Sequence, residues 1–344
     1  MKPKRITIKD IAKEAGVSET TVSRFLNKKF EYMGHDTRLK IEKVVKELNY
    51  RPSNIARSLK SNKSKLLGAV IADIENPFSN IIIKGLIDRA NALGYSLMVS
   101  ISNNSIEREN EGIRTFIDNG VEGLIVNTVT DSETLLKEVS ETTPVLLIDR
   151  SIDNLDVDLV TSNNFELGSE LLTHLIESGY KKIGFFSEEM KNNSVRQIRH
   201  QAFIESTKDV EGIEAETFII DREKPEETVK LLERFLDSDI PPVIVAGNGL
   251  IQLALLKVLI ELDFEFGEDY GFCGFDDWDW STLVGKDGIT SISQNSYSLG
   301  TESIDILHKR ITNEIKEKDP ILKTIKGKLI VRGSTRLHAK ENER

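Results

Sequence analysis

Residues 8–24 read IKDIAKEAGVSETTVSR, and this stretch decides which kind of domain opens the chain. Thr7 can cap a first helix, whose apolar residues recur at helical spacing until Gly16 breaks it. Ser18 can cap a second helix over about residues 19–27. Two short helices joined by a turn that contains glycine predict a helix-turn-helix.

A third amphipathic helix is predicted near residues 36–48 and would close a small apolar core. The second helix then keeps one polar face, whose side chains can bond bases or phosphates. The charge distribution agrees with this: residues 1–65 carry 17 Lys and Arg against 7 Asp and Glu, whereas the whole chain has a net charge of −10. A basic head on an acidic body predicts that only the head meets a phosphate backbone.

Two literal motifs make the prediction more specific. Residues 8–24 closely resemble the head signature of LacI/GalR-family regulators, and residues 48–60, LNYRPSNIARSLK, resemble the hinge segment of that family. The resemblance implies a three-helix DNA-binding head with a hinge helix over residues 1–62. One stretch departs from it: family members often place Ser before the third helix, where this chain reads YMGHDT at residues 32–37.

The resemblance places the second helix in the major groove, with Thr20 and Arg24 reading base edges. Arg24 can pair bidentately with guanine, and Thr20 can contact a thymine methyl or a base acceptor. Glu19 either accepts from cytosine N4 or serves the helix dipole. Smaller polar residues are predicted to contact phosphates, and Ser18 can do so while it caps the helix. These predicted phosphate contacts are Thr7, Ser18, Thr21, Ser23 and Asn27.

In the hinge, the family pattern makes Leu59 a wedge that enters between base pairs from the minor groove, with Ala56 and Lys60 beside the DNA. A leucine in such a run is more commonly a packing residue, but its basic surroundings favour the wedge. A segment this short is a poor isolated helix, because helix nucleation is costly. We therefore expect it to order on DNA, beside its copy from a second subunit.

Beyond residue 65, short apolar runs alternate with longer amphipathic stretches. The runs are typical of buried parallel strands and the stretches of helices, which together predict an α/β body of doubly wound parallel sheets. The runs are too many for one comfortable sheet, so two lobes with a cleft between them are predicted. The predicted strands are 66–71, 96–101, 123–127, 145–148, 182–186, 215–220, 243–246 and 271–275.

The family resemblance continues through the body, in DIENPF at residues 73–78, GFDD at residues 274–277 and VRGST at residues 331–335. It implies an effector-binding and dimerisation body over residues 66–336, similar to periplasmic sugar-binding proteins. Such a body has three crossovers and binds its ligand at the carboxyl ends of the strands, as open α/β sheets do. The implied lobe one takes about residues 66–162 and 294–322, and the implied lobe two about residues 163–293 and 325–336.

Several residues occupy positions where relatives line the effector cleft. Asp276 ends a strand and could bridge two sugar hydroxyls, and Arg199 could hold a carboxylate or phosphate in a bidentate pair. The alternative for each arginine is a surface or lobe-bridging ion pair, and for Trp278 it is core packing instead of stacking on a sugar. The predicted effector-binding residues are Phe78, Asn127, Asp149, Arg150, Arg196, Arg199, Asp276, Trp278 and Gln294.

Two other classes of protein compete with this interpretation. An enzyme is disfavoured because the chain lacks a Gly-x-Gly-x-x-Gly run, a Walker loop, a Gly-x-Ser-x-Gly elbow and a histidine pair at metal spacing, so no catalysis, cofactor or metal is predicted. The single Cys273 lies in an apolar run and excludes an internal disulfide. A non-regulatory sugar-binding protein of the periplasmic type would need an export signal, which the N-terminus lacks, and has no use for a basic head.

The sequence therefore predicts a cytoplasmic, sequence-specific transcriptional regulator, a repressor of carbohydrate-metabolism genes under the control of a sugar-like effector. A homodimer on a palindromic double-stranded operator is predicted, because two-fold proteins match two-fold sites. No membrane partner is predicted, since no apolar run approaches the roughly 18 residues of a spanning helix. The arginine-rich candidates favour a sugar acid, of keto-deoxy-gluconate type, over a neutral sugar, a sugar phosphate or a phosphoprotein partner. Release of DNA by the effector and tightening on DNA both stay open.

Overall fold

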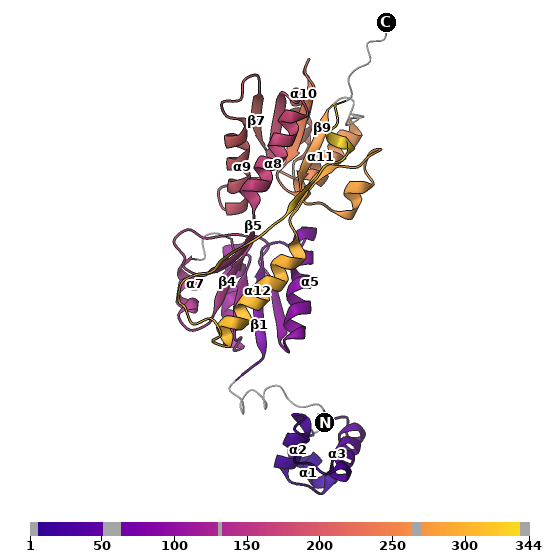
Figure 1. Cartoon of the computed structure of the whole chain (residues 1–344), viewed down its shortest axis with the longest axis vertical. Coiled ribbons are helices and arrows are strands. Elements are labelled where there is room, and N and C mark those ends of the chain that lie inside the picture. The colour runs from indigo at the N-terminus through magenta and orange to yellow at the C-terminus, as the bar shows by residue number, and fades with distance from the viewer. Residues whose placement is uncertain (1–5, 51–62, 130–132, 263–269, 338–344) are drawn as a thin grey trace. The chain divides into compact units, whose positions relative to one another are not determined.

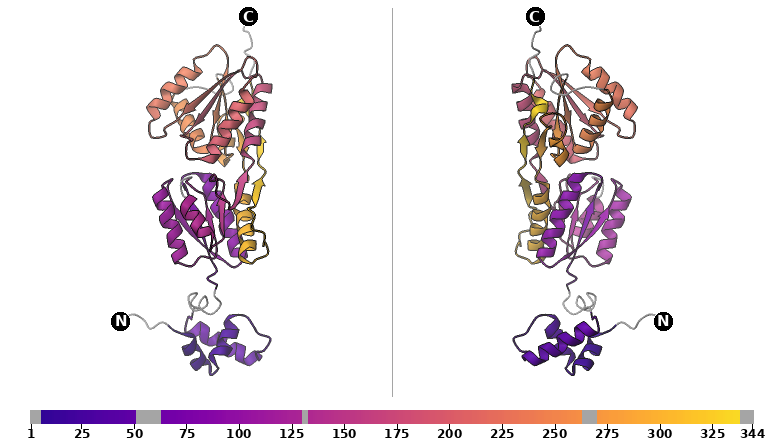
Figure 2. Two further views of the ribbon diagram at one scale, coloured as in Figure 1. Left: turned by 90° about the vertical axis from the view of Figure 1, so that its left-hand side faces the viewer. Right: turned by 90° about the vertical axis from the view of Figure 1, so that its right-hand side faces the viewer.

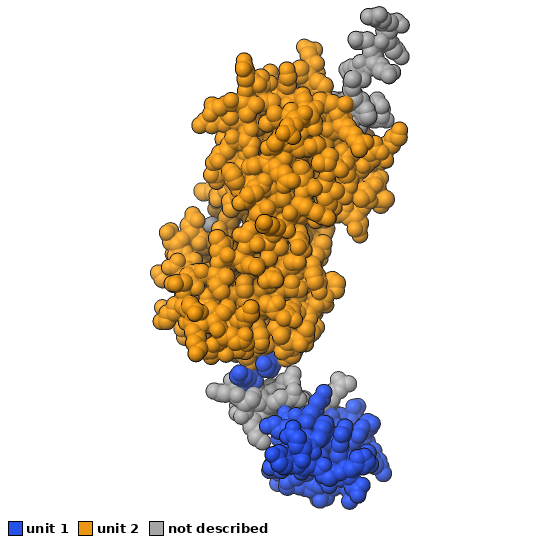
Figure 3. All heavy atoms as spheres, viewed as in Figure 1, with its two compact units in different colours: residues 1–65 blue, residues 66–344 orange. Residues whose placement is uncertain are grey.

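A computed structural model describes residues 6–50, 63–129, 133–262 and 270–337. The chain divides into two compact units, residues 1–65 and residues 66–344 (Figure 3). The predicted hinge contacts Ala56, Leu59 and Lys60 lie outside the described residues.

The N-terminal unit is a three-helix head. Ile11, Val22 and Ile41, one from each helix, are fully buried in a shared apolar core. The predicted helix-turn-helix and its third helix are therefore confirmed. The helices are α1 (Ile8–Ala15), α2 (Glu19–Leu26) and α3 (His35–Glu47).

The first two helices begin and end where their capping residues dictate. Thr7 and Asp10 form a capping box, in which each side chain accepts from the backbone N–H of the other. Gly16 ends α1 with a φ of 65°, a left-handed conformation that glycine adopts without strain. The Ser18 hydroxyl then accepts from the Thr21 N–H at 3.2 Å and starts α2. The sequence motif thus fixes the turn between the two helices.

The body contains two sheets, each of six strands in its described part (Figure 1). Neighbouring strands pair in parallel except β10 and β12, which are antiparallel. The first sheet has the order β11 (Leu322–Ile325), β5 (Asp158–Ser162), β4 (Val145–Ile148), β3 (Leu124–Val126), β1 (Leu66–Ile71) and β2 (Ser96–Ile101). The second has the order β12 (Lys328–Ile330), β10 (Thr290–Ser293), β9 (Gly271–Phe275), β8 (Pro242–Ala246), β6 (Lys182–Ser187) and β7 (Glu214–Ile219).

Helices cover both faces of each sheet, which explains why the central strands β1, β3, β4, β6, β8 and β9 are rich in buried apolar residues. In β1, Ala69 and Ile71 belong to the core shared with α5 and α12, whereas Val70 between them belongs to the core on the other face, with α6 and α7. The second sheet is likewise buried between α10 and α11 on one face and α8 and α9 on the other. The helices are α5 (Pro77–Ala92), α6 (Ile106–Asp118), α7 (Glu133–Ser140), α8 (Asn164–Glu177), α9 (Ser194–Thr207), α10 (Pro225–Leu236), α11 (Gly249–Glu261) and α12 (Ser296–Ile311), with short 3-10 turns η1 (Asp279–Thr282) and η2 (Gly333–Thr335).

The chain passes between the two lobes three times: from β5 into α8, from β10 into α12, and from β11 into β12 (Figure 2). This confirms the doubly wound, two-lobed body. The sequence predicted eight strands and missed β5, β10, β11 and β12, all of which are short and contain polar residues. Cys273 is fully buried in β9, as its apolar surroundings predict. None of the described helices is both long and apolar enough to span a bilayer.

Candidate functional site

A pocket with about 520 Å³ of empty space, part of it open to solvent, lies at the carboxyl ends of the strands of both sheets. Asp149 comes directly after β4 of the first sheet, and Glu188 and Asp276 come directly after β6 and β9 of the second. The carboxyl ends of the strands of both sheets therefore bring these carboxylates to one pocket. Eight of the nine predicted effector residues line it. The complete lining is Asp73, Asn76, Phe78, Ser79, Asn127, Asp149, Arg150, Glu188, Asn193, Val195, Arg196, Arg199, Asn248, Leu250, Asp276 and Gln294.

Arg199 is the most firmly held of the pocket arginines. Each of its three nitrogens donates one hydrogen bond: Nε to Asn164 Oδ1 at 2.9 Å, Nη1 to the Gly247 carbonyl at 2.8 Å and Nη2 to Gln294 Oε1 at 2.7 Å. Its guanidinium also stacks on the Phe275 ring, 4.0 Å from the ring centre. Because its side chain is only 5% exposed, this guanidinium is part of the wall of the pocket.

Asp276 is tied to the same network. Its Oδ1 accepts from Gln294 Nε2 at 2.5 Å, and its Oδ2 accepts from the Gly249 N–H at 2.9 Å, at the start of α11. The carboxylate therefore lies at a positive helix end, which stabilises its charge. Gln294 joins the Asp276 carboxylate to the Arg199 guanidinium without direct contact between the two charges.

Asp149 differs from Asp276 because its hydrogen bonding is incomplete. It has a φ of 68°, is 8% exposed, and its buried Oδ1 has no hydrogen-bond partner in the described part of the chain. Burial raises the pKa of Asp149, and the positive charges of Arg199 and Arg150 oppose that shift. A buried acceptor without a partner is costly, so its place in the pocket wall suits a ligand hydroxyl.

Arg150 is held through one nitrogen. Its Nη1 donates to Asn104 Oδ1 at 3.1 Å and to the Thr128 carbonyl at 3.2 Å. No carboxylate of the described residues comes within 4 Å of its guanidinium. Arg150 thus lines the pocket, and only one edge of its guanidinium, at Nη1, has hydrogen-bond acceptors in the described part of the chain.

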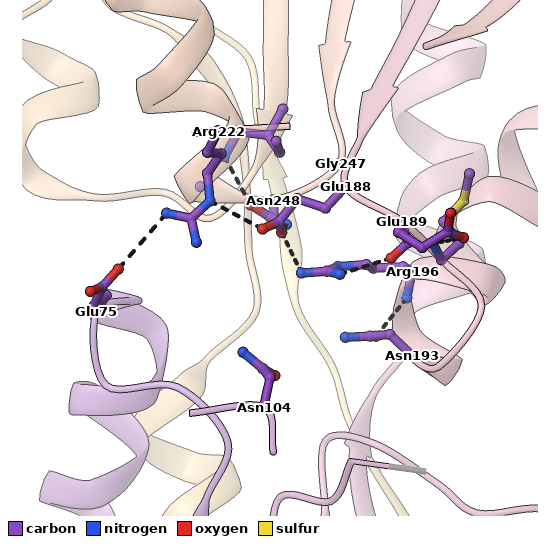
Figure 4. Close-up of polar contacts among 12 residues, drawn as sticks. Glu75, Asn104, Glu188, Glu189, Asn193, Arg196, Arg222, Gly247 and Asn248 are labelled. Atoms are coloured by element: carbon purple, nitrogen blue, oxygen red, sulfur yellow. Dashed lines mark hydrogen bonds and ion pairs between the residues drawn. The ribbon is translucent and has the colours of Figure 1, made fainter. Parts of the chain in front are cut away.

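Arg196 belongs to an ion-pair chain along one side of the pocket (Figure 4). It pairs through Nη2 with Glu188, whose carboxylate also accepts from Arg222 Nε at 3.1 Å and from Asn248 Nδ2 at 2.9 Å. Arg222 reaches across to the other lobe, where Glu75 Oε2 lies 3.9 Å from its Nη1. This chain of ion pairs therefore runs from the second lobe to the first, and its hub, Glu188, is not among the predicted effector-binding residues.

Trp278 is the one predicted effector residue that does not line the pocket. Its ring packs against Gly249, where a Cβ atom would lie 2.4 Å from Trp278 Cζ2. It is 8% exposed and contacts Trp280 edge to face at 5.4 Å. Trp278 is therefore a core-packing residue, because its ring packs against the start of α11.

Other lining residues that the sequence analysis missed share one recognisable signal. Asp73, Glu188 and Asn248 each stand one or two residues beyond a buried apolar strand. Polar residues just beyond a parallel strand lie at the ligand edge of the sheet, so a search for them would have found these three. Asn76 and Asn193 instead cap the helices that start at this edge.

In the head, the predicted base-reading residues lie on the exposed side of α2. Glu19, Thr20 and Arg24 are all exposed. Ser18 does cap α2, and its hydroxyl also contacts that of Thr21 at 2.9 Å. Of the other predicted phosphate contacts, Thr7 and Asn27 are exposed and Thr21 and Ser23 half-buried.

Comparison with known proteins agrees with this architecture. Residues 7–53 match the model of bacterial regulatory proteins of the lacI family, and residues 64–329 match that of periplasmic binding proteins and the sugar binding domain of the LacI family. The chain is 36% identical to the HTH-type transcriptional regulator KdgR of Bacillus subtilis (95% of this chain, 97% of KdgR) and 33% identical to PtxS of Pseudomonas putida (96% of each). A crystal structure of the lac repressor dimer bound to operator and an anti-inducer superposes with a TM-score of 0.82 at 23% identity, covering 97% of this chain and 100% of that one. This chain belongs to the LacI family and is a DNA-binding transcriptional regulator with a helix-turn-helix head and a periplasmic-binding-protein-like body.

Proposed function

We propose that this regulator is a repressor of carbohydrate-metabolism genes, controlled by a sugar or sugar acid that binds between the lobes of its body. The observation that carries this proposal is the pocket, in which donors and acceptors from both lobes face one space of about 520 Å³. A sugar presents several hydroxyls that need such convergent polar groups. Asp149 and the remaining lone pairs of Asp276 supply acceptors for hydroxyls, and Arg150 supplies donors.

The head is proposed to bind a palindromic double-stranded operator. Thr20 and Arg24 would read base edges in the major groove, with Glu19 either reading a cytosine or serving the helix dipole. Thr7, Ser18, Thr21, Ser23 and Asn27 would contact phosphates. In the hinge, Leu59 would act as the wedge, with Ala56 and Lys60 beside the DNA.

We divide the chain into a DNA-binding head and hinge, residues 1–62, and an effector-binding and dimerisation body, residues 66–336. A homodimer is proposed because one small head buries too little surface for selective binding. Large apolar side chains remain exposed on α11 and after η1, namely Leu253, Ile260 and Leu283. In a dimer formed by contacts between bodies, Leu283→Asp should increase the monomer fraction in sedimentation, whereas Leu322→Asp, equally apolar and exposed on β11, should not.

We propose neither catalysis nor a cofactor for this protein. We place the protein in the cytoplasm, where operator DNA is accessible. The matched relatives are transcriptional regulators. A non-regulatory sugar-binding protein would share the body, but it would not need Arg24 on an exposed helix face.

The experiment that tests the proposal selects bound fragments from the organism's own genomic DNA. We expect enrichment of one palindromic sequence near carbohydrate genes, bound at least about a thousandfold more tightly than random DNA. A thermal-shift screen of sugars, sugar acids and sugar phosphates then finds compounds that change this binding. Equal affinity for the selected and random DNA would contradict the proposal and favour the sugar-binding protein.

A further inference from the structure

The three guanidiniums in the pocket wall differ in which of their donors are already used and in whether a carboxylate pairs with them. Arg199 donates once through each of its three nitrogens, so neither edge of its guanidinium is free. Arg196 donates from Nη1 to the Glu189 carbonyl and is neutralised through Nη2 by Glu188. Arg150 donates only through Nη1, to an amide oxygen and a carbonyl. A guanidinium carries five N–H donors, so Nε–H and the two Nη2–H of Arg150 have no acceptor in the described part of the chain.

The unused edge of Arg150 has the geometry that recognises a carboxylate. Nε–H and one Nη2–H point the same way in one plane and match the two oxygens of a carboxylate or phosphate. The contacts to Asn104 and Thr128 fix the opposite edge of the guanidinium, so its orientation is set before a ligand arrives. This fixed orientation reduces the conformational entropy lost on binding.

The neighbouring Asp149 provides the complementary acceptor. Its Oδ1 is buried without a hydrogen-bond partner, although the residue is 8% exposed and lines the same pocket. One strand end therefore presents an unused donor pair and an unused acceptor on consecutive residues. A group with a carboxylate next to a hydroxyl, as in an aldonic acid, satisfies both.

The other charges of the pocket leave room for an anion. Glu188 is shared by Arg196 and Arg222, and both oxygens of Asp276 accept hydrogen bonds. Asp73 accepts from the Glu75 N–H at 2.8 Å. The carboxylates other than Asp149 are thus already engaged, and none of them neutralises Arg150 by direct contact.

We infer that Arg150, and neither Arg199 nor Arg196, receives the carboxylate of an acidic sugar effector, and that Asp149 accepts from the adjacent hydroxyl. The inference rests on the proposed function, since it assigns a ligand group to the proposed effector pocket. Arg199 then positions Gln294 and Asp276 in the wall and leaves recognition of the acid to Arg150.

The test uses matched ligands on the full-length protein. D-Gluconate and D-glucitol have the same carbon chain and share the hydroxyls at C2–C6, and they differ in the carboxylate; D-galactonate and D-galactitol form a second pair of the same kind. By calorimetry, the protein should bind at least one acid about tenfold or more tightly than its neutral partner, as a charge-assisted bidentate pair implies. Arg150→Gln should bring the two affinities within about threefold, and Arg150→Lys should restore part of the preference, because a single ammonium keeps the charge but loses the fork.

Arg114→Gln is the matched control, since Arg114 is exposed on α6 and does not line the pocket. It should leave the preference for the acid unchanged, and thermal unfolding of every variant reports whether it folds. A preserved acid preference in Arg150→Gln, or a wild type that prefers the neutral partner, overturns the inference while the sugar-controlled regulator stands. If the wild type binds no member of either pair and no sugar or sugar acid in the screen, the inference and the proposed effector class both fall.

Discussion

Arg24 illustrates how a single side chain can separate specific from non-specific DNA binding. It is exposed near the end of α2, the second helix of the helix-turn-helix. Arg24→Ala should weaken binding to the selected operator by about 1–3 kcal/mol and reduce discrimination at one base pair, because a bidentate guanine contact is lost. Binding to the operator and to single-base variants of it, measured at one salt concentration, checks this.

Lys43→Ala is a suitable control for Arg24, because Lys43 is an exposed cation of α3 that pairs with Glu47 at 3.7 Å. It should leave base discrimination intact. If Arg24→Ala instead lowers affinity equally for operator and random DNA, Arg24 contacts only phosphate, and the base reading must come from Thr20 and Glu19.

At the residue scale, the sequence predicted which side chains gather in the pocket better than what they do there. Asp149 and Asp276 could be predicted because each ends a buried apolar run. The division of work between Arg199 and Arg150 could not, since it depends on Gly247 and Gln294, which lie far along the chain and accept from Arg199 only after folding. Hydrogen-bond partners across such separations leave no local pattern.

At the element scale, the close crossing of α5 and α12 depends on two glycines. A Cβ at Gly85 would lie 2.4 Å from the Tyr297 carbonyl oxygen, and one at Gly300 would lie 2.4 Å from the Ile82 carbonyl oxygen. The two helices lie side by side in the first lobe (Figure 1). Because backbone atoms are the obstacle, the helices would have to move apart to admit a methyl group.

We therefore expect Gly85→Ala to lower the free energy of unfolding of the body by about 1–3 kcal/mol, despite the higher helix propensity of alanine. Urea unfolding followed by tryptophan fluorescence and circular dichroism measures the change. Gly34→Ala is the control, since Gly34 has an ordinary φ of −61° and no atom within 4 Å of its added Cβ. An unchanged urea midpoint for Gly85→Ala would show that the two helices can move apart without lowering the free energy of unfolding.

The ion-pair chain that begins at Glu188 links elements of both lobes, and its members differ in burial. The Glu188 side chain is 17% exposed and serves Arg196, Arg222 and Asn248, whereas Glu75 is 76% exposed and 3.9 Å from Arg222. Glu188→Gln should destabilise the body by about 1–3 kcal/mol, because it leaves the half-buried Arg196 without a counter-charge and Arg222 with only the exposed Glu75. Glu75→Gln should cost at most about 1 kcal/mol, as exposed pairs do. Urea unfolding of both variants checks the order, and equal losses would show that Glu188 is no hub.

The four strands that the sequence did not predict lie where the chain crosses from one lobe to the other. β5 reads DLVTS and β10 reads TSIS, and both lie next to crossovers, where strands are short and only partly apolar. Of the eight predicted strands, the central ones lie in apolar runs that helices bury on both faces, and only β2 and β7 are edge strands with exposed residues. Local periodicity therefore identified the interior of each lobe and missed the strands that join the lobes.

At the scale of the whole molecule, the pocket lies where the two lobes are joined by three crossovers. Ser151 N–H donates to Ser194 Oγ at 2.9 Å across the lobes, and Arg222 reaches Glu75 on the same route between lobes. A ligand that contacts both lobes favours the arrangement in which both sets of contacts can form. It can shift the DNA-binding equilibrium only by its differential affinity for the two arrangements, typically about 1–3 kcal/mol of coupling.

Arg199→Ala and Asp276→Asn should therefore abolish the effector response while operator affinity without effector stays within a few-fold of wild type. Arg199→Ala removes the donor to Gln294, and Asp276→Asn removes the carboxylate that accepts from Gln294 and from the start of α11, so both break the wall that joins the lobes. Leu59→Ala should do the reverse, weakening operator binding with ligand affinity nearly unchanged, because the proposed wedge acts only on DNA. Each variant is titrated separately with operator and with the compound found in the screen.

A normal effector response in both pocket variants would place the effector elsewhere in the body, although the chain would remain a LacI-family regulator. If the pocket variants instead lose operator binding without effector, the hydrogen bonds among Arg199, Gln294 and Asp276 also stabilise the arrangement of the lobes that binds DNA.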